Sequence, residues 1–584
     1  MADEYITSDI TGTYTVGYAD DVYLLPGVTF YEIGTAFEIN QTADIVIGGT
    51  VFGGTIFEQT ATSKGYFGIS VLESGIVHGE MKVLESSATN PIAGLYFSND
   101  GSVTANWEII DVYTDWFYFT NTGTMTARQS SVLTAVSLDA NDDARVVNTG
   151  TMTANYSEVM RFDDYDNVYI NNTGTIQSRE AIRAYDIGTI NIHNSGTITG
   201  YLSFYSTNQD VNVNNSGLMD GSGFAALGMY VEGDVHVINS GTIVGLYTTE
   251  VTDSLTVFNT GTITRVGLAD TAFSLNESAI YVGGADAVLH NSGLISGDVT
   301  GGDVIGFGYA EGTLTMYNGG TVQGSVNGMN QGDFYRANGA GVVTGGVFGQ
   351  EGDDTLIGGS DSDLLDGGDE NDLLRGQAGN DEMIGGNGAD TLDGGDGNDT
   401  LTGGSGLDRL VGGNGDDNMD GGADFDRLYG GNGADTLNGG TGNDSLWGGN
   451  DDDLLMGGDG DDRLFGGVGV NEFDGGLGRD IYYAQAGEDI LIFRDAAESA
   501  TGAARDVVYG YDVGQDQIDL AAVAPGVLTY LGTSAFSGTA NEVRIIEYTS
   551  GSTVVQVDVN ADGASDMELM VYRVQGLTED DFVL

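Results

Sequence analysis

The chain has 584 residues, with 87 acidic and 18 basic side chains, a net charge of −69, 96 Gly, 3 Pro and no Cys. This length requires more than one folding unit, the 40% hydrophobic content is too high for a wholly disordered chain, and Pro is too rare for collagen. The negative charge argues against binding to nucleic acids or anionic lipids, and the lack of Cys excludes disulfides and thiolate metal sites.

The N-terminal region shows no targeting segment of a familiar kind. The first residues, MADEYITSDITG, lack the basic and apolar stretches of a secretory signal peptide. No apolar run in the chain approaches the roughly 20 residues that a membrane helix needs. We therefore expect no membrane insertion, and we expect that any export signal lies elsewhere in the chain.

Residues 1–348 carry a loose repeat of about 24 residues built on the tripeptide Asn-(Thr/Ser)-Gly. The alternating stretches between the tripeptides, such as NVYINN and DVHVIN, are typical of strands. We expect the Gly to supply positive φ in a tight turn, and the Asn either to join that turn or to stack on its counterpart in the next coil. One coil per repeat, rising by about 4.8 Å, predicts a parallel β-solenoid; an array of β-sandwiches is the alternative. The tripeptides start at Asn121, Asn148, Asn172, Asn194, Asn215, Asn239, Asn259 and Asn291, with degenerate copies at Asn99 and Asn318.

Residues 349–483 divide into fifteen consecutive units of nine without insertion or deletion, as in GGNGADTLD and GGDGNDTLT. Position six is Asp in every unit except one, where it is Asn471, and position eight is always apolar or aromatic. Gly at positions one, two and four permits a loop whose carbonyls turn inward, and positions seven to nine form a short strand. Two units close one turn of 18 residues, so that units two apart stack on each other. A disordered Gly/Asp-rich linker would not keep this register.

The stacked loops predict calcium. Carboxylates at position six would repel one another across the stack, and a cation that takes six to eight oxygen ligands resolves this repulsion. Mg²⁺ fits poorly because it demands strict octahedral geometry. Thirteen pairs of stacked units predict up to about 13 Ca²⁺ ions. The predicted ligands are Asp354, Asp363, Asp372, Asp381, Asp390, Asp399, Asp408, Asp417, Asp426, Asp435, Asp444, Asp453, Asp462 and Asp480.

These nonapeptides resemble the repeats-in-toxin (RTX) calcium-binding β-roll, with consensus GGxGxDxUx. The resemblance covers residues 349–483, and it weakens at Asn471 and at four units whose fourth residue is Asp361, Glu370, Asp424 or Asp451. RTX proteins usually end in an uncleaved signal for a type I exporter, with acidic residues before a few apolar ones. The present chain ends EDDFVL.

The last 101 residues, 484–584, leave both repeats and are expected to form a β-rich cap. Residues 506–523 resemble the strand-turn-strand that follows the β-roll in serralysin-type domains. The segment DVNADGASD resembles a further calcium loop, with Asp558, Asn560, Asp562 and Asp566 as ligands. An EF-hand is not expected, because the position that needs Glu holds Leu569. A plain turn is the alternative.

No catalytic motif stands out. The four His lie in IVHGE, NIHNS, DVHVI and VLHNS, so His-Glu-x-x-His is absent and a zinc protease is excluded. No Gly-x-Ser-x-Gly elbow is convincing. Polysaccharide lyases and alginate epimerases also combine solenoids with RTX repeats, but the Asp-Pro-His element of the epimerases is missing. The run 111–119, DVYTDWFYF, either stacks on sugar rings or packs in the solenoid wall.

The sequence therefore predicts an all-β protein with three parts: a β-solenoid (1–348), a calcium-binding β-roll (349–483) and a C-terminal cap with a type I secretion signal (484–584). We expect an extracellular or cell-surface protein without enzymatic activity, folded by calcium, self-associating in a surface layer, matrix or filament. The alternatives are an adhesin that binds a surface polysaccharide and an enzyme that acts on one.

Overall fold

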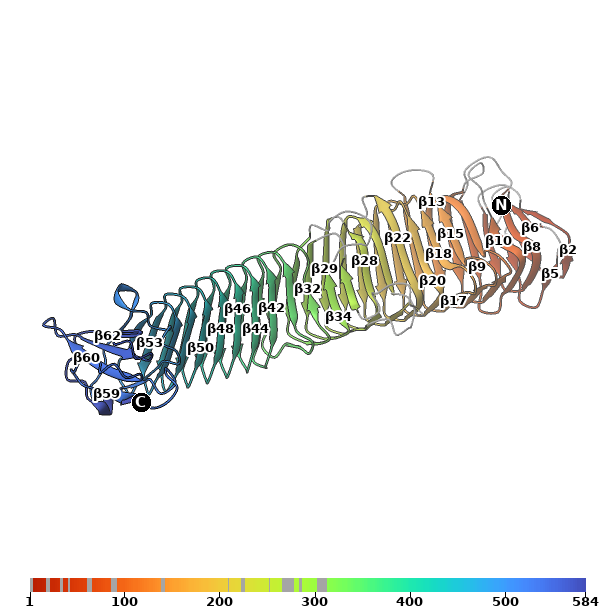
Figure 1. The fold of residues 1–584 in the computed structure, drawn as a ribbon. Coiled ribbons are helices and arrows are strands. Elements are labelled where there is room, and N and C mark those ends of the chain that lie inside the picture. Colours follow the sequence, from red (N-terminus) through yellow and green to blue (C-terminus); the bar gives the residue numbers. More distant parts are fainter. Residues whose placement is uncertain are drawn as a thin grey trace. The chain divides into compact units, whose positions relative to one another are not determined.

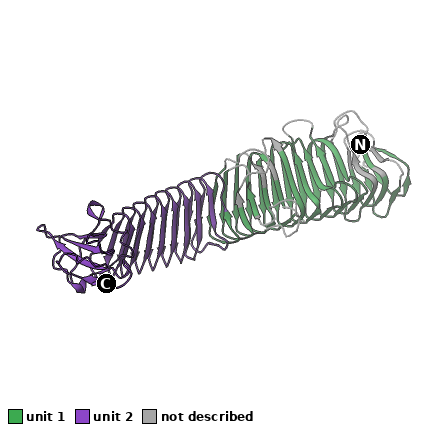
Figure 2. Ribbon diagram, viewed as in Figure 1, with its two compact units in different colours: residues 1–326 green, residues 327–584 purple. Residues whose placement is uncertain are grey.

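The computed structural model describes residues 4–16, 22–31, 35–39, 43–59, 66–85, 92–137, 142–207, 210–221, 226–251, 253–264, 278–282, 286–301 and 312–584. The chain forms two compact units, residues 1–326 and 327–584 (Figure 2). In this described part, the only helical segments are two 3-10 turns, Gly502–Ala504 and Glu579–Asp581. None of its helices is long and apolar enough to cross a membrane. The prediction of an all-β protein is confirmed.

Unit 1 is a parallel β-solenoid, seen in the red to green part of Figure 1. Successive strands of one row pair in parallel and in register, as β19 (Asn167–Asn172) does with β21 (Thr189–Asn194). Each coil contributes to three rows of strands. The predicted solenoid is confirmed, and the β-sandwich alternative is wrong.

The first row contains β1 Glu4–Ile6, β4 Val22–Leu24, β7 Ala43–Ile47, β9 Tyr66–Val71, β11 Ile92–Asn99, the second half of β13 Ile110–Asn121, β16 Asp143–Asn148, β19, β21, β23 Asp210–Asn215, β26 Asp234–Asn239, β29 Ser254–Asn259, β32 Asp286–Asn291 and β35 Leu314–Asn318. The second row contains β2 Ile10–Thr11, β5 Thr29–Tyr31, β8 Thr50–Gln59, β10 Ile76–Glu85, β12 Ser102–Ala105, β14 Thr124–Ala127, β17 Thr151–Ala154, β20 Thr175–Tyr185, β22 Thr197–Thr207, β24 Leu218–Asp220, β27 Thr242–Val244, β30 Thr262–Thr264, β33 Leu294–Ser296 and β36 Thr321–Gln323. The third row contains parts of the longer strands together with eight short ones. These are β3 Tyr14–Val16, β6 Thr35–Ile39, β15 Leu133–Val136, β18 Glu158–Asp163, β25 Leu227–Glu232, β28 Leu246–Val251, β31 Ser278–Val282 and β34 Asp298–Gly301.

The interior of unit 1 is filled by the alternate residues of these strands. In one coil, Val168 and Ile170 of the first row and Ile176 and Ile182 of β20 are all buried. The alternation follows from the period of two in a strand, which sends one set of side chains inward and the other to solvent. Burial of Val and Ile in every coil stabilises unit 1 by about 1.5–3 kcal/mol per side chain.

A ladder of Asn side chains follows the first row from Asn99 to Asn318. In each of its nine steps, Nδ2 donates to Oδ1 of the Asn in the next coil at 2.7–2.9 Å. These Asn residues are the ones that start the predicted tripeptides, and they are buried. The steps span 20 to 32 residues, so the coils differ in length although the ladder is regular. Each Asn therefore stacks on its counterpart in the next coil, which confirms one of the two predicted alternatives.

The Gly of each tripeptide has a different role from the predicted one. Gly123 and Gly150 are absent from the residues with positive φ, so the turn does not need a left-handed conformation. A Cβ on Gly150 would instead lie 2.1 Å from the carbonyl oxygen of Gly123 in the preceding coil. The prediction of positive φ was wrong, because close stacking of the backbones, rather than the turn's dihedral angles, excludes a side chain.

Unit 2 begins with a β-roll of short strands that alternate between two rows (blue-green in Figure 1). Residues 18 positions apart pair, as Leu392 does with Leu410. Position eight of each nonapeptide points into a thin core, where Leu392, Leu401 and Leu410 are buried. One row contains β38 Phe334–Ala337, β41 Thr355–Ile357, β43 Leu373–Ala378, β45 Thr391–Asp396, β47 Arg409–Asn414, β49 Arg427–Asn432, β51 Ser445–Asn450, β53 Arg463–Val468 and β55 Ile481–Tyr483, and the other contains β40 Val347–Glu351, β42 Leu364–Asp369, β44 Glu382–Asn387, β46 Thr400–Ser405, β48 Asn418–Ala423, β50 Thr436–Thr441, β52 Leu454–Asp459, β54 Glu472–Leu477 and β56 Ile490–Ile492.

The C-terminal segment closes the roll. Strands β57 (Asp506–Tyr509) and β58 (Gln517–Asp519) add one parallel rung to each row, which confirms the predicted strand-turn-strand. Strands β60 (Glu542–Glu547), β61 (Thr553–Asp558) and β62 (Met567–Val571) form an antiparallel sheet, and β59 (Thr529–Tyr530) pairs with β60. The final strand, β63 (Phe582–Val583), pairs in parallel with β58. The predicted β-rich cap is confirmed, and the acidic-apolar end of the chain is part of it.

Candidate metal centre

Two columns of Asp side chains run through the roll, one on each side of the core. Within the nonapeptides, the backbone N–H of a position-six Asp donates to Oδ1 of the position-six residue 18 positions later, as from Asp390 to Asp408 at 2.8 Å. The same bond links Asp399 to Asp417 at 2.8 Å. All of these Asp residues are at most 8% exposed. The structure therefore places each predicted array ligand beside the partner that stacking predicted. One column is Asp333, Asp354, Asp372, Asp390, Asp408, Asp426, Asp444, Asp462, Asp480 and Asp506, and the other is Asp363, Asp381, Asp399, Asp417, Asp435, Asp453, Asn471, Asp489 and Asp516.

The second carboxylate oxygen, Oδ2, is left without a partner along most of both columns. Fourteen Oδ2 atoms are buried and accept no hydrogen bond in the described structure. A buried carboxylate oxygen in this state costs free energy unless a cation or a proton compensates it. The fourteen belong to Asp354, Asp372, Asp381, Asp390, Asp399, Asp408, Asp417, Asp426, Asp435, Asp444, Asp453, Asp462, Asp480 and Asp489.

Backbone carbonyls converge on the same places. A Cβ on Gly412, at position one of its unit, would lie 2.2 Å from Oδ2 of Asp417 and 2.8 Å from the carbonyl oxygen of Gly430. The corresponding distances from Gly403 are 2.5 Å to Oδ2 of Asp408 and 2.6 Å to the carbonyl oxygen of Gly421. Any side chain at position one would fill this space. The absence of a side chain brings a carboxylate and a carbonyl oxygen together in every unit of this kind.

The donor set fits a hard cation bound largely by the backbone. Among the residues that the structure describes, no three Asp, Glu or His side chains gather closely enough to hold a metal ion by themselves. Backbone carbonyls must therefore supply most of the ligands. Ca²⁺ accepts such ligands, whereas Zn²⁺ prefers His and Cys. The Oδ2 atom of each position-six Asp and the carbonyl of a position-one Gly are the groups that would hold it.

Burial raises the pKa of these carboxyl groups, and neighbouring carboxylates raise it further. The pKa is about 9 for Asp480, about 8 for Asp354, about 7 for Asp417 and about 6 for Asp390. The backbone N–H that each Oδ1 accepts lowers the pKa, but it does not offset the loss of hydration. A metal-free array at neutral pH thus has many groups that resist ionisation.

The metal-free array is expected to be more stable in acid. Because its carboxyl pKa values are raised, the folded state holds protons that the unfolded chain releases above its pKa of about 4. Stability should therefore fall as pH rises from about 4 to about 9, the upper value being that of Asp480. Far-UV circular dichroism of calcium-depleted protein at pH 5, 7 and 9 checks this, because the β-rich signal of the array should be largest at pH 5 and should be lost at the higher pH values. With saturating calcium the trend should reverse, because the ion competes with the proton. A signal that stays the same at all three pH values in the depleted series contradicts the expectation.

A family model of the RTX calcium-binding nonapeptide repeat matches overlapping segments that together cover residues 348–491. These residues are RTX repeats. The RTX array, as residues 348–491 are called from here on, binds calcium. The predicted resemblance and the predicted cofactor are confirmed.

Similar solved structures are distant. The AlgE6R3 subunit of the Azotobacter vinelandii mannuronan C5-epimerase is 22% identical with a TM-score of 0.20, covering 28% of this chain and 78% of that one. The extracellular lipase LipA from Serratia marcescens is 17% identical with a TM-score of 0.17, covering 40% of each chain, so the present chain spans less than half of the lipase. A search of curated proteins found no match.

The two Asp columns extend beyond the predicted ligands at both ends. Asp333 precedes the predicted ligands, and Asp489, Asp506 and Asp516 follow them in the same hydrogen-bonding pattern. The steps to Asp354, Asp506 and Asp516 are 21, 26 and 27 residues, so a search at a strict period misses them. Asp489 had a usable signal, since AQAGEDILI keeps Asp at position six and Leu at position eight.

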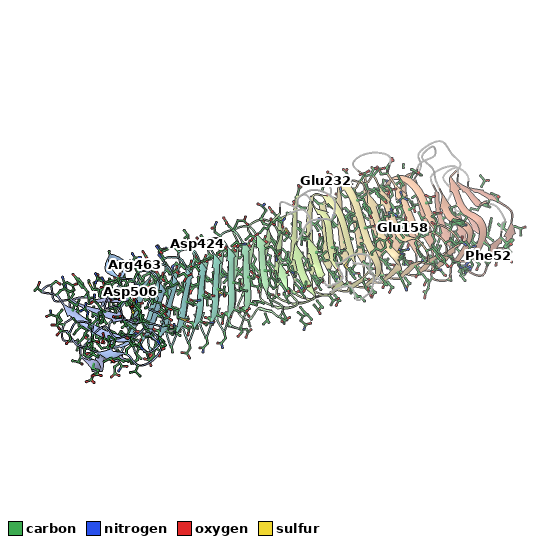
Figure 3. The ribbon with its side chains drawn as sticks, in the orientation of Figure 1. Phe52, Glu158, Glu232, Asp424, Arg463 and Asp506 are labelled. Carbon is green, nitrogen blue, oxygen red and sulfur yellow. The ribbon has the colours of Figure 1, made fainter. Side chains whose placement is uncertain are left out.

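The ends of the columns differ from the middle in how Oδ2 is satisfied. Oδ2 of Asp363 accepts the backbone N–H of Gly359 at 2.7 Å, and Oδ2 of Asp516 accepts that of Asp512 at 2.7 Å. Oδ2 of Asp506, labelled in Figure 3, faces the hydroxyl of Tyr482 at 3.5 Å. Of the predicted ligands in the array, Asp363 alone has its second oxygen bound within the protein.

Departures from the consensus leave the roll intact. At position four, Glu370, Asp424 and Asp451 adopt φ of 78–79°, the left-handed conformation that Gly normally supplies. At position six, Asn471 accepts from Asp453 N–H at 3.2 Å, and its Nδ2 donates to Oδ1 of Asp489 at 3.0 Å. An amide donor at that point replaces an oxygen that could bind a cation. Asn471 therefore interrupts the series of free Oδ2 atoms, although the hydrogen-bonded column continues through it.

The predicted C-terminal loop is a compact hydrogen-bonded turn. Asp558 accepts the backbone N–H groups of Ala561 and Gly563 at 2.8 and 2.9 Å. Nδ2 of Asn560 donates to Asp566 at 2.7 Å. Asp562 instead accepts Ala564 N–H at 2.7 Å. The N–H of Asp562 donates to Oδ1 of Asn560 at 2.9 Å, so the structure brings all four predicted ligands into one hydrogen-bonded turn. Their oxygens already accept N–H groups, and calcium binding here stays a prediction.

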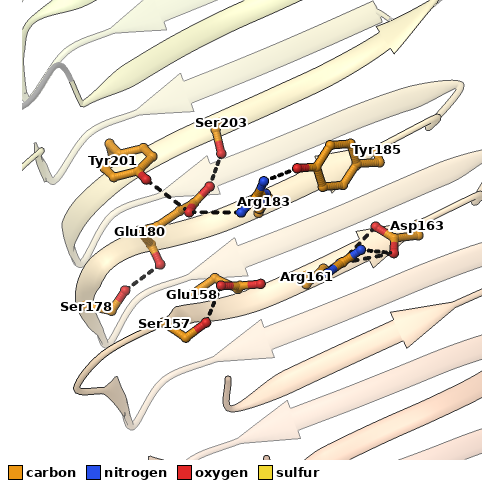
Figure 4. Close-up of polar contacts among 10 residues, drawn as sticks. All are labelled: Ser157, Glu158, Arg161, Asp163, Ser178, Glu180, Arg183, Tyr185, Tyr201 and Ser203. Atoms are coloured by element: carbon orange, nitrogen blue, oxygen red, sulfur yellow. Dashed lines mark hydrogen bonds and ion pairs between the residues drawn. The ribbon is translucent and has the colours of Figure 1, made fainter. Parts of the chain in front are cut away.

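A polar cluster on the third row of unit 1 has the residue types of a polysaccharide-active site (Figure 4). Glu158 and Glu180 are register partners on adjacent coils. Glu180 accepts from Ser203 and, at 3.1 Å, from Tyr201, and it lies 3.6 Å from Arg183. Burial and the neighbouring Glu180 raise the pKa of Tyr201 to about 12, so this phenol keeps its proton at neutral pH. The cluster therefore holds coils together and offers no phenolate base.

Proposed function

We propose that the protein is secreted, folds in extracellular calcium and acts as a structural component of the cell surface. The observation that supports this best is the double column of buried Oδ2 atoms in an RTX array. Extracellular calcium modules bind at about 10⁻⁴–10⁻³ M, so the array would stay unfolded in the cytosol, where its charge keeps the chain soluble. Export by a type I system fits such a chain, because binding energy becomes folding energy only outside.

In this proposal, the position-six carboxylates of the RTX array hold up to about 13 calcium ions. Each ion would take one or more Oδ2 atoms and backbone carbonyls of position-one Gly residues. The middle of both columns supports this assignment most strongly, because Asp408 and Asp417 have buried oxygens with no other partner. We assign a weaker role to Asp363, whose Oδ2 accepts a backbone N–H.

The structural role is proposed from the solenoid itself. A stack of coils offers long flat rows of strands and, among the described strands, an unpaired edge at its first coil, both suited to repetitive self-association in a layer, matrix or filament. An adhesin that binds a surface polysaccharide is the second candidate, supported by the hollows described in the next subsection. A polysaccharide-active enzyme is third, since the carboxylate cluster in Figure 4 is internally paired.

Replacing Asp417 by Ala is expected to weaken both calcium binding and surface assembly. The substitution removes a buried Oδ2 and the Oδ1 that accepts Asp399 N–H, so at least one ion should be lost and the metal-bound melting temperature should fall. Asp416→Ala, one residue earlier and exposed, is the matched control and should bind calcium as the unmodified protein does. Calorimetry counts the ions, and electron microscopy of secreted protein with and without calcium follows assembly.

Two outcomes would contradict the proposed function. One is ordered assembly that survives full removal of calcium. The other is a calcium-loaded, folded array inside the cell. Equal effects of Asp416→Ala and Asp417→Ala would contradict the assignment of the position-six ligands.

A further inference from the structure

The run 111–119 of unit 1 divides between core and surface. Phe117 and Phe119 are buried, whereas Trp116 is 38% exposed. Tyr118 points outward with it, since side chains alternate along β13. Only the inward half of this aromatic run packs in the wall. The outward half needs another explanation.

Of these two outward rings, Tyr118 belongs to a row that continues over five coils, and Trp116 lies beside that row, in register with Gly94. Tyr96, Tyr118, Arg145, Tyr169 and Asn191 are register partners on β11, β13, β16, β19 and β21. At about 4.8 Å per coil, the row is roughly 19 Å long. The rings of Tyr96 and Tyr118 are stacked with centroids 5.3 Å apart, and the guanidinium of Arg145 lies 4.9 Å above the ring of Tyr169.

Two adjoining hollows open along this row. The first, of about 460 Å³, is lined by Tyr96, Trp116 and Tyr118 together with Asp143 and Arg145. The second, of about 270 Å³, is lined by Tyr118, Arg145, Tyr169, His193 and neighbouring amides. They share Tyr118 and Arg145, so they lie side by side along the row. Together we call them the tyrosine groove, defined by Tyr96, Trp116, Tyr118, Arg145, Tyr169 and His193.

Four polar side chains of the groove make no hydrogen bond or ion pair within the described part of the chain. Within the described residues, Arg145 makes no ion pair, and neither His193 nor the hydroxyls of Tyr118 and Tyr169 make a hydrogen bond. Elsewhere in unit 1 comparable groups are paired, as Arg161 is with Asp163 at 2.9 Å. Exposed aromatic walls beside unpaired donors suit a ligand that has both apolar C–H faces and hydroxyl groups.

We propose that the tyrosine groove binds an extended, uncharged glycan chain. Trp116 and the outer parts of the tyrosine rings offer apolar surface to pyranose rings, while Arg145, His193 and the phenol groups hydrogen-bond to hydroxyls. The rise of about 4.8 Å per coil is close to the length of one sugar unit, so successive sugars meet successive coils. Arg145 and Asp143 offset each other, and the net charge of −69 disfavours a polyanion. The groove lies wholly in unit 1 and does not rest on the calcium-dependent role proposed above.

Binding is tested by calorimetry on the full-length, calcium-loaded protein with hexasaccharides of β-linked glucose, mannose, galactose and N-acetylglucosamine. At least one should bind, and Tyr118→Ala and Arg145→Gln should each reduce its affinity tenfold or more. Arg145→Gln replaces an exposed side chain and keeps the test valid if Tyr118→Ala does not fold. The matched controls are Tyr156→Ala and Trp107→Ala, at residues 79% and 48% exposed outside the groove, and these should change affinity less than twofold.

Two further arms separate the alternatives. A hexamer of galacturonate should bind at least tenfold more weakly than the best neutral sugar. Binding of the neutral sugar should persist in chelator, which separates this inference from the calcium-dependent function. The proposal is overturned if no neutral hexasaccharide binds, if only the galacturonate hexamer binds, or if the control variants lose affinity as the groove variants do.

Discussion

Removal of calcium from the full-length protein is expected to unfold the RTX array and leave unit 1 folded. Without the ion, the fourteen buried Oδ2 atoms are either ionised without a partner or, because burial raises the pKa of these carboxyl groups, protonated but still without a hydrogen-bond partner. At a hundredfold excess over its dissociation constant, each bound ion contributes about 2.7 kcal/mol. Several ions together thus exceed the 5–15 kcal/mol that typically stabilises a domain.

Hydrogen-exchange mass spectrometry of the whole chain resolves the two units. In chelator, backbone amides of residues 354–480 should exchange within seconds, whereas those of the strands between Asn99 and Asn318 should keep their protection. The Asn ladder and the buried Val and Ile of unit 1 do not depend on a cation. Millimolar calcium should restore protection and magnesium should not. Simultaneous loss of protection in both units would refute the separate dependence, and protection of the array in chelator would refute the role of the ion.

Replacing Asn172 by Ala is expected to destabilise unit 1 by about 2–6 kcal/mol, since two buried partners lose a hydrogen bond at about 1–3 kcal/mol each. Nδ2 of Asn148 and Oδ1 of Asn194 both lie 2.7 Å from the missing amide. Asn172→Asp should be at least as harmful, because it places an acid at a fully buried position against the acceptor of Asn194.

The neighbouring Asn171 provides the matched control. It lies on the same strand, points outward and is exposed, so Asn171→Ala should stay within about 0.5 kcal/mol. Denaturant unfolding in saturating calcium measures the difference. Tryptophan fluorescence in a Trp447→Phe background reports unit 1 alone, because the other two Trp are Trp107 and Trp116. An Asn172→Ala midpoint equal to that of Asn171→Ala would show that the ladder does not stabilise the solenoid.

The array was predictable because every nonapeptide has the same surroundings. When one unit repeats without insertion, its neighbours two units away are known from the sequence alone, so Asp390 and Asp408 could be paired before any coordinates. The same reasoning held for the Asn of the solenoid, where the recurring Asn-(Thr/Ser)-Gly turn identifies Asn172 and Asn194 although the intervening length varies. Local pattern and strict period thus determined the fold class and most of the ladder.

The tertiary structure decided what depends on the distance between coils. The sequence cannot show that Oδ2 of Asp417 lacks a partner while that of Asp363 accepts Gly359 N–H, because both obey the same consensus. Nor can it show that Gly150 avoids contact with a carbonyl 27 positions earlier in the chain, rather than a forbidden φ. Asp506 and Asp516 joined the ladder across steps of 26 and 27 residues, and Trp116 turned outward while Phe117 turned inward. The contact at Gly150 and the two long steps of the ladder concern atoms from different coils, whose approach is determined by backbone stacking and not by neighbours in the chain.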